Sequence, residues 1–375
     1  MNSSKEIVYD YAIVGGGIAG LSTAYHLVRD GHSVVVFDRD NCLSNASFNS
    51  TAITSHDPDC DWDKVIEKFG IEGARDIWKL GEHSMKMLAE YAHKVNPHFV
   101  AKRLPAHIFS TSAKMDEIVA SKYELYKKLG GHATLIKEGS TIFKTFRTVL
   151  TVEAEGQSNN QALLKTLVRA VKYHGGKILT YAPVSEVKEE KGASTIVYKE
   201  GDSLRAKKVL FATGEGALHP ALMGLTVKRR TFVMAYDKQD IPKPFRGSVL
   251  WDMADPYHYI RSFRGRTVWV GGSDILDSDY DPKKDDSYYG AVDKFAHDTL
   301  LFDSTYKKSG QWSGTFYPAK DIEVPYIGEI PGSSNYANLG FGGTGILMSF
   351  VSGYLFASWA KGKETGYKKY FALDR

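Results

Sequence analysis

The first forty residues combine apolar and polar positions in a regular order. Residues 8–14 form an apolar, β-rich run that ends in glycines, and residues 19–30 repeat apolar side chains with helical spacing until Gly31 ends the helix. Residues 33–37 follow as an apolar run without alternation, which is typical of a strand buried on both faces of a parallel sheet. The pattern predicts a strand–helix–strand unit.

Beyond this unit the pattern changes once, near residue 228. Helical spacing recurs in segments before it and in one after it, at 62–95, 112–129, 160–174 and 286–303. Short strands are predicted at 177–181, 184–187 and 208–213, and a denser antiparallel block is predicted at 231–236, 248–251, 258–263 and 267–271. Because α/β signals stand at the start, middle and end of the chain, we expect one ligand domain that is assembled from separated segments.

Composition and charge narrow the class of protein. The 375 residues, 43% hydrophobic and 25% charged, suit a soluble globular chain of one large domain or two entwined ones. A net charge of +4 argues weakly for nucleic acid, so no nucleic-acid partner is expected. Two cysteines cannot form a disulfide framework. Together with an N-terminus that lacks a basic and apolar leader, they predict a cytoplasmic protein.

Two other possibilities are not expected. The uncharged stretch 339–360 is long enough to cross a bilayer, but its glycines favour a loop followed by a buried helix from Ile346. No transmembrane segment is therefore predicted. The twelve histidines show no metal-ligand spacing, so no metal site is predicted.

The strongest motif is the glycine run that follows the first strand. Gly15, Gly17 and Gly20 have the G-x-G-x-x-G spacing, directly before the first helix. The first glycine permits a tight turn, the second lets backbone N–H groups approach a pyrophosphate, and the third lets helix and strand pack closely. Asp38 ends the second strand 18 residues after Gly20, where a carboxylate accepts hydrogen bonds from ribose hydroxyls.

These features indicate an adenine dinucleotide but leave NAD and FAD open. Asp38 argues against NADP because it would repel the extra phosphate, although Arg39 lies next to it. Two further glycine-rich segments, at 211–216 and 340–346, favour FAD, because a permanently held flavin needs contacts along its whole length.

The chain resembles the FAD-dependent amine and amino-acid oxidoreductases of the D-amino-acid oxidase, glycine oxidase and sarcosine oxidase type. The resemblance rests on the N-terminal fingerprint, residues 45–52, Ala212-Thr213-Gly214, residues 312–314, residues 325–328 and the final glycine segment. It implies an α/β fold (α+β overall), in which a Rossmann-like FAD-binding domain is interleaved with an antiparallel substrate-binding sheet. We expect the FAD-binding domain at 1–95, 146–226 and 313–375, and the substrate-binding domain at 96–145 and 227–312.

The resemblance also implies the cofactor contacts. The cofactor would contact the N-terminal fingerprint, including Ile18 and Ala19, and the pair Asp38 and Arg39. Further contacts would come from Ala46, Ser47, Thr51, Ala52, Ile53, Val184, Ala212, Thr213, Gly214, Gly342, Gly343, Thr344, Gly345, Ile346 and Leu347. The last residues would begin a helix whose dipole stabilises negative charge on the reduced ring. No cysteine lies in 312–320, where sarcosine oxidases attach flavin covalently, so the FAD is expected to be non-covalent.

The substrate side is expected on the strand 258–263. Tyr259 and Arg261 share one face of it by the two-residue period, and could bind a substrate carboxylate as catalytic residues. Phe316 stands where glycine-oxidase-like members carry a carboxylate-binding arginine, so Arg261 replaces that arginine or the substrate lacks an α-carboxylate. Phe316 and Phe341 are expected beside the substrate.

The predicted reaction is hydride transfer from an amine or amino acid to flavin N5, which gives an imine that hydrolyses. Reduced flavin would then pass electrons to O2 or to another acceptor; the oligomeric state is left open. One alternative is a 2-hydroxy-acid dehydrogenase that uses His258 or His219 as base. A flavoprotein whose main role is to bind a partner is the other.

Overall fold

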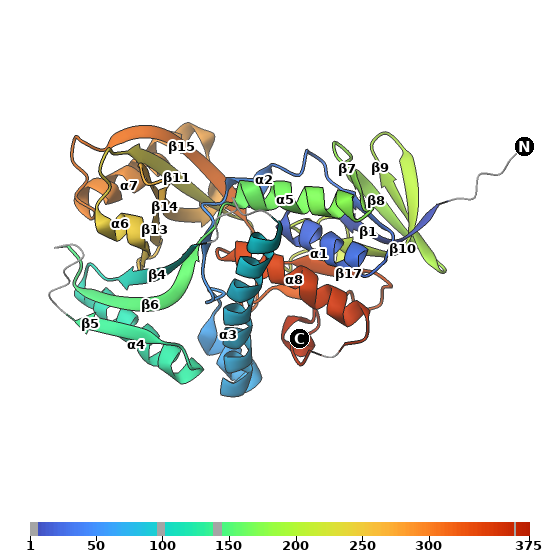
Figure 1. The fold of residues 1–375 in the computed structure, drawn as a ribbon, viewed down its shortest axis with the longest axis horizontal. Helices are drawn as coiled ribbons and strands as arrows, with labels where there is room; N and C mark the ends of the chain where they lie inside the picture. The colour runs from blue at the N-terminus through green and yellow to red at the C-terminus, as the bar shows by residue number, and fades with distance from the viewer. Residues whose placement is uncertain (1–6, 96–101, 138–144, 364) are drawn as a thin grey trace, which may run out of the picture.

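The computed structural model describes residues 7–95, 102–137, 145–363 and 365–375. Residues 1–6, which carry the expectation of a missing leader, and the predicted start of the second domain at residue 96 lie outside this part. Two large β-sheets lie side by side, with helices packed on them (Figure 1). The predicted fold class, α/β with an interleaved antiparallel sheet, is confirmed.

The first sheet contains the dinucleotide-type strands. It comprises β1 (Val8–Val14), β2 (Val34–Phe37), β7 (Lys177–Leu179), β8 (Val184–Glu190), β9 (Ala193–Tyr198), β10 (Asp202–Phe211), β16 (Tyr326–Glu329) and β17 (Tyr336–Leu339). Its main order is β16-β17-β10-β1-β2-β7, and the hairpin of β8 and β9 pairs with β10. Because β1 pairs in parallel with both β10 and β2, the carboxyl ends of these three strands lie together at the same end of the sheet.

Both faces of this sheet are buried, as the apolar strands predict. Ile13 and Val36 face one hydrophobic cluster, whereas Val14 and Val35 face another. Among the helices that contribute to the first cluster are α1 (Ile18–Arg29), α5 (Asn160–Tyr173) and α8 (Gly345–Ala360).

The contact between α1 and α8 is unusually close. A Cβ atom on Gly353 would lie 2.4 Å from the carbonyl carbon of Ser22. The Ser22 hydroxyl donates a hydrogen bond to the carbonyl of Phe350 at 2.5 Å. The two helices therefore pack backbone to backbone, so the position of one fixes that of the other.

The second sheet is mostly antiparallel. It comprises β3 (Ile53–Thr54), β4 (Lys102–Phe109), β5 (Ala133–Lys137), β6 (Thr148–Gln157), β11 (Arg229–Asp237), β12 (Val249–Asp252), β13 (His258–Phe263), β14 (Thr267–Leu276) and β15 (Lys307–Phe316). The order is β15-β11-β14-β13-β12-β4-β6-β3, with β5 beside β6. Phe232, Ile260 and Val270 form its core with side chains from α6 (Lys243–Gly247) and α7 (Asp285–Asp298).

The remaining helices lie around the two sheets. They are α2 (Asn45–Asn49), α3 (Trp62–Val95), α4 (Ala113–Leu129) and α9 (Lys368–Phe371), with short 3₁₀ turns at Pro220–Leu222, Asp277–Asp279 and Pro282–Lys284. Gly70, with φ +71°, interrupts the long helix predicted over 62–95. Within the described residues, no helix is both long and apolar enough to cross a membrane.

Five strands of the second sheet were not predicted, namely β3, β4, β5, β6 and β15. The predicted division puts 146–226 in the FAD-binding domain, but β6 pairs with β4 and β5 in the second sheet. It also ends the substrate-binding domain at 312, whereas β15 continues to Phe316. The two-domain division stays a prediction, and strand pairing moves these two boundaries.

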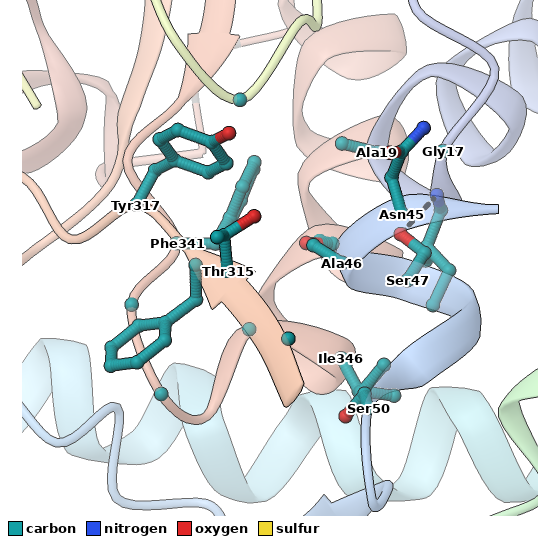
Figure 2. A pocket seen from close by; sticks show the side chains of 18 of the residues that line it. Gly17, Ala19, Asn45, Ala46, Ser47, Ser50, Thr315, Tyr317, Phe341 and Ile346 are labelled. Carbon is teal, nitrogen blue, oxygen red and sulfur yellow. Dashed lines mark hydrogen bonds between the residues drawn. The ribbon is translucent and has the colours of Figure 1, made fainter. Parts of the chain in front are cut away.

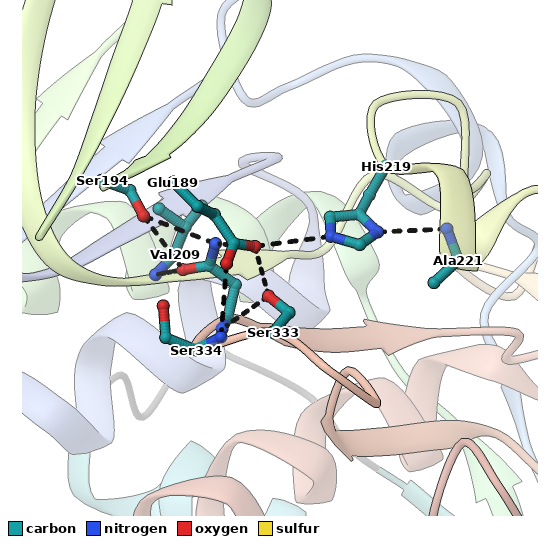
Figure 3. A network of polar contacts seen from close by, with 8 residues as sticks. Glu189, Ser194, Val209, His219, Ala221, Ser333 and Ser334 are labelled. Atoms are coloured by element: carbon teal, nitrogen blue, oxygen red, sulfur yellow. Dashed lines mark hydrogen bonds and ion pairs between the residues drawn. The ribbon is translucent and has the colours of Figure 1, made fainter. Parts of the chain in front are cut away.

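The buried Asn335 links the β8–β9 hairpin to β10 through Glu189 and Val209, which are labelled in Figure 3. The Asn335 side chain accepts a hydrogen bond from Val209 N at 2.8 Å and donates one to Glu189 Oε1 at 2.8 Å. Ser333 and His219 also contact the Glu189 carboxylate. Since β17 pairs with β10 from Leu210 onward, Asn335 satisfies the N–H just before that pairing begins.

We predict that Asn335→Ala lowers the free energy of unfolding by about 1–3 kcal/mol, because it leaves the buried Val209 N–H unpaired. Thermal or denaturant unfolding of the purified protein measures this. The matched control is Ser334→Ala, which alters an exposed side chain one residue away. Equal stability of the two variants would contradict the role of Asn335.

Candidate functional site

A cavity of ≈ 680 Å³ lies where the ends of β1, β2 and β10 approach the second sheet. This volume is within the range of about 300–1,000 Å³ that is typical of ligand pockets. Ala46 and Ser47 lie across the cavity from Tyr317 and Phe341 (Figure 2). Its wall is therefore built from segments that are distant in sequence.

The glycine turn after β1 forms one side of the cavity. Gly15 has φ +113°, and a Cβ there would lie 2.3 Å from the carbonyl oxygen of Ala212. A Cβ on Gly20 would lie 1.9 Å from the carbonyl oxygen of Gly15. Both positions thus require glycine. Gly17 caps α1 without a side-chain hydrogen bond, and no acidic residue lies in the first turn. The N-terminus of α1 can therefore bind an anion.

Asp38 lines the cavity at the end of β2. Its carboxylate accepts hydrogen bonds from Gly16 N at 2.8 Å, Asp40 N at 2.9 Å and Cys42 N at 3.2 Å. Asp38 therefore fixes the glycine turn and the loop after β2 at the same edge. Arg39 also lines the cavity, and its exposed guanidinium lies 3.7 Å from Asp40.

The loop before α8 forms the opposite side. Gly343, Thr344 and Gly345 line the cavity, and Thr344 caps α8 without a side-chain hydrogen bond. The Thr344 hydroxyl is buried and has no partner among the described residues. Because these residues begin α8, the positive dipole end of this helix also faces the cavity. No acidic residue in the first turn offsets that charge.

Most of the predicted contact residues line the cavity. They are Gly15, Gly17, Ile18, Ala19, Asp38, Arg39, Ala46, Ser47, Thr51, Ile53, Val184, Ala212, Thr213, Gly214, Gly342, Gly343, Thr344, Gly345, Ile346, Tyr259, Phe316 and Phe341. Gly20, Ala52, Leu347 and Arg261 are not in the lining. Gly20 is at the helix–strand contact, and Ala52 and Leu347 are fully buried behind the wall.

Tyr259 reaches the cavity from β13. Its hydroxyl lies 3.0 Å from the Thr231 hydroxyl, and burial raises the pKa of the phenol. Gly271, opposite it on β14, leaves the space for the ring, since a Cβ there would lie 2.4 Å from the ring atoms. Tyr259 is thus held as a neutral hydrogen-bonding group in the cavity wall.

Arg261, expected to share the substrate side with Tyr259, points to other partners. Its Nη1 donates hydrogen bonds to the carbonyls of Thr51 and of Ser158, the latter at 3.1 Å. The guanidinium also lies 5.1 Å from the centre of the Trp269 ring, and burial lowers its pKa to about 10. The side chain therefore holds the lining segment near Thr51 against the second sheet, away from the cavity.

The two histidines considered as bases are also engaged elsewhere. His258 Nδ1 lies 2.9 Å from Asp252 Oδ2, its Nε2 lies 3.4 Å from Ser273 Oγ, and its ring stacks on Phe295. His219 accepts from Ala221 N and contacts Glu189 (Figure 3). Neither histidine belongs to the lining formed by the described residues.

The sequence pattern did not reveal an acidic end of the cavity. Asp57, Asp59, Lys122 and Tyr257 all contribute to the lining. Lys122 Nζ lies 3.1 Å from Asp57 Oδ2. The alternating acids after β3 were the available signal, but a charged run normally indicates a solvated surface. Nothing in the helical pattern of 112–129 distinguished Lys122.

A second unpredicted residue is Asn160, the buried first residue of α5. Its Nδ2 donates to the carbonyls of Ser47, Phe48 and Ser50 at 2.7, 2.7 and 3.0 Å. One side chain thus holds the lining segment in place. An asparagine at a helix start normally indicates a cap, so the pattern did not reveal this role.

The cavity fits a long dinucleotide. Two uncapped helix N-termini, glycines that allow close backbone approach and a carboxylate at the end of β2 occur in one cavity. The glycine turn and α1 would hold the pyrophosphate, Asp38 the ribose end, and the loop before α8 the flavin end.

Comparisons with known proteins agree with this geometry. The glycine oxidase structure from Geobacillus kaustophilus is 18% identical, covers 98% of this chain and 99% of its own, and superposes with a TM-score of 0.85. The L-proline dehydrogenase structure from P. horikoshii is 16% identical, covers 98% of this chain and 97% of its own, and superposes with a TM-score of 0.80.

A longer relative is also similar. The putative Rieske 2Fe-2S iron-sulfur protein YhfW of Bacillus subtilis (strain 168) is 24% identical over 98% of this chain and 71% of its own length. The model of the FAD dependent oxidoreductase family matches residues 10–359. This match covers nearly the whole described fold, including both uncapped helix ends, and the chain therefore belongs to the FAD-dependent oxidoreductase family.

Proposed function

We propose that this FAD-dependent oxidoreductase oxidises a C–N bond of an amine or amino acid. The main support is one continuous cavity that joins the dinucleotide edge of the first sheet to Tyr257 and Tyr259 of the second. A substrate there would lie between the flavin loop and these phenols. Among the similar structures, one is a glycine oxidase and another an L-proline dehydrogenase, names that agree with C–N chemistry.

The positions of the histidines favour an amine over a 2-hydroxy acid. Oxidation of an alcohol generally needs a base that takes the hydroxyl proton. His258 is held by Asp252 and Ser273, and His219 lies in the Glu189 network, both outside the lining. An amine can react in its neutral form and needs no such histidine.

The side chains of the cavity would orient the substrate and exclude water. Bound FAD supplies the hydride acceptor, to which the α-carbon of the amine gives its hydride. Tyr259, held by Thr231, offers a hydrogen bond to the substrate, and Phe316 and Phe341 provide apolar walls. The positive end of α8 stabilises negative charge that develops nearby. The resulting imine hydrolyses in water.

Anaerobic reduction tests this function. We expect a panel of amines and amino acids to bleach the flavin band of the purified holoprotein, and Tyr259→Phe to slow bleaching by roughly tenfold or more because a hydrogen bond is lost. Tyr173→Phe, at an exposed tyrosine, is the control. Peroxide formation in air separates O2 from another acceptor. A flavin that no compound of the panel bleaches would contradict the proposal and support a partner-binding role.

A second prediction concerns Arg261. We expect Arg261→Met to lower the thermal midpoint and to weaken retention of FAD, because the Thr51 and Ser158 carbonyls lose their donor at a cost of about 1–3 kcal/mol. Arg264→Met, at an exposed arginine on the same hairpin, is the control. Full FAD retention combined with lost turnover would instead restore Arg261 as a substrate ligand.

A further inference from the structure

The charges around the cavity are unevenly balanced. In the described part of the chain, two cationic side chains line it, Arg39 and Lys122. Arg39 is beside Asp40, and Lys122 forms a 3.1 Å ion pair with Asp57. Each cation thus already faces a carboxylate. An anionic ligand would find no unpaired cation in this lining.

Asp59, in contrast to these paired cations, is a carboxylate in the lining without a charged partner among the described residues. It lines the cavity, and its side chain is accessible from the cavity although the surrounding protein largely shields it from bulk water. Its backbone N donates to Asp57 Oδ1 at 2.9 Å. Its carboxylate has no hydrogen bond or ion pair with any described residue. Asp57, in contrast, is satisfied by Lys122, Trp62 and Tyr126.

Asp59 also lies next to the loop that is expected to follow the flavin. A Cβ on Gly343 would lie 3.4 Å from Asp59 Oδ2 and 3.2 Å from the Tyr257 hydroxyl. The carboxylate and this phenol therefore converge on one point of the wall. Glycine at 343 leaves room there for a ligand.

A second carboxylate makes this end of the cavity more negative. Asp274, on β14, is a second carboxylate close to Asp59, and burial raises its pKa to about 6 while the neighbouring Thr231 and Tyr257 side chains oppose this rise. Burial raises the pKa of Asp59 to about 7; Lys122 opposes this rise, and the charges of Asp57, Glu323 and Asp274 add to it. A cationic ligand would relieve this accumulation of negative charge.

We propose that Asp59 binds the ammonium group of the substrate and accepts one of its protons, so that the amine reacts in its neutral form, and that the substrate is an alkylamine without an α-carboxylate. This inference rests on the proposed function and narrows its substrate class. Phe316, in place of the arginine found in glycine-oxidase-like members, is consistent with it because, among the described residues, the lining holds no unpaired cationic side chain that could bind a substrate carboxylate. Asp59 is thereby a specificity-determining residue.

Ligands that cannot react provide the test. tert-Butylammonium has no hydrogen on the carbon next to nitrogen, so it cannot donate a hydride, and pivalate has a similar shape with negative charge. Perturbation of the flavin absorbance of the holoprotein reports binding. We expect wild type to bind tert-butylammonium and not pivalate, and Asp59→Asn to weaken binding roughly 10–100-fold through loss of a charge-assisted hydrogen bond.

Asp61→Asn is the matched control, because Asp61 lies two residues away and pairs with Lys64 outside the cavity. It should leave the affinity unchanged. Binding by wild type should also weaken as the pH falls through about 7, the pKa of Asp59, since protonation removes its charge. Asp59→Asn should lose this pH dependence.

Tighter binding of pivalate, binding of neither probe, or an unchanged affinity of Asp59→Asn would overturn the proposal. Should Asp59→Asn fail to hold FAD, the charge preference of wild type and its pH dependence decide the question. Binding of tert-butylammonium with no amine able to bleach the flavin would support the ammonium site and contradict the proposed function. Reduction by amino acids in preference to alkylamines would support the proposed function and contradict the ammonium site.

Discussion

The close packing of α1 on α8 is the constraint on which the site depends. The two helices come from opposite ends of the chain, yet Gly353 leaves no space for a side chain against Ser22. Because this contact is rigid, both N-termini open on one cavity at fixed separation. A long anionic cofactor can then be bound by backbone groups at two points, without a dedicated cationic side chain at either helix end.

The sequence was informative wherever local chemistry permits few residue types. Gly15 and Gly20 fill positions where any Cβ would collide with a carbonyl oxygen, so the geometry of the turn dictates their spacing. The strand–helix–strand unit followed from apolar residues on both faces of β2, which parallel pairing requires. The same reasoning located most of the cavity wall.

Residues whose roles arise from distant partners could not be predicted in this way. Arg261 was expected to face the substrate from its strand, but its partners are the carbonyls of Thr51 and Ser158. No local sequence pattern predicts a contact between segments so far apart in the chain. Asp57 and Lys122 read as solvated charges because each belongs to a polar sequence, and only the fold brings them together in a buried pair. Such a pair offsets its desolvation cost through good geometry and additional hydrogen bonds.

Strand β15 was missed because it is polar, and that polarity has a consequence for solubility. It forms one edge of the second sheet, and residues from Lys307 to Gln311 are exposed. An edge strand offers unpaired backbone groups to any other strand that approaches. Lys307 and Lys308 would need to lose water and face like charges if two copies paired along this edge. The lysines that concealed the strand thus protect the sheet against edge-to-edge aggregation.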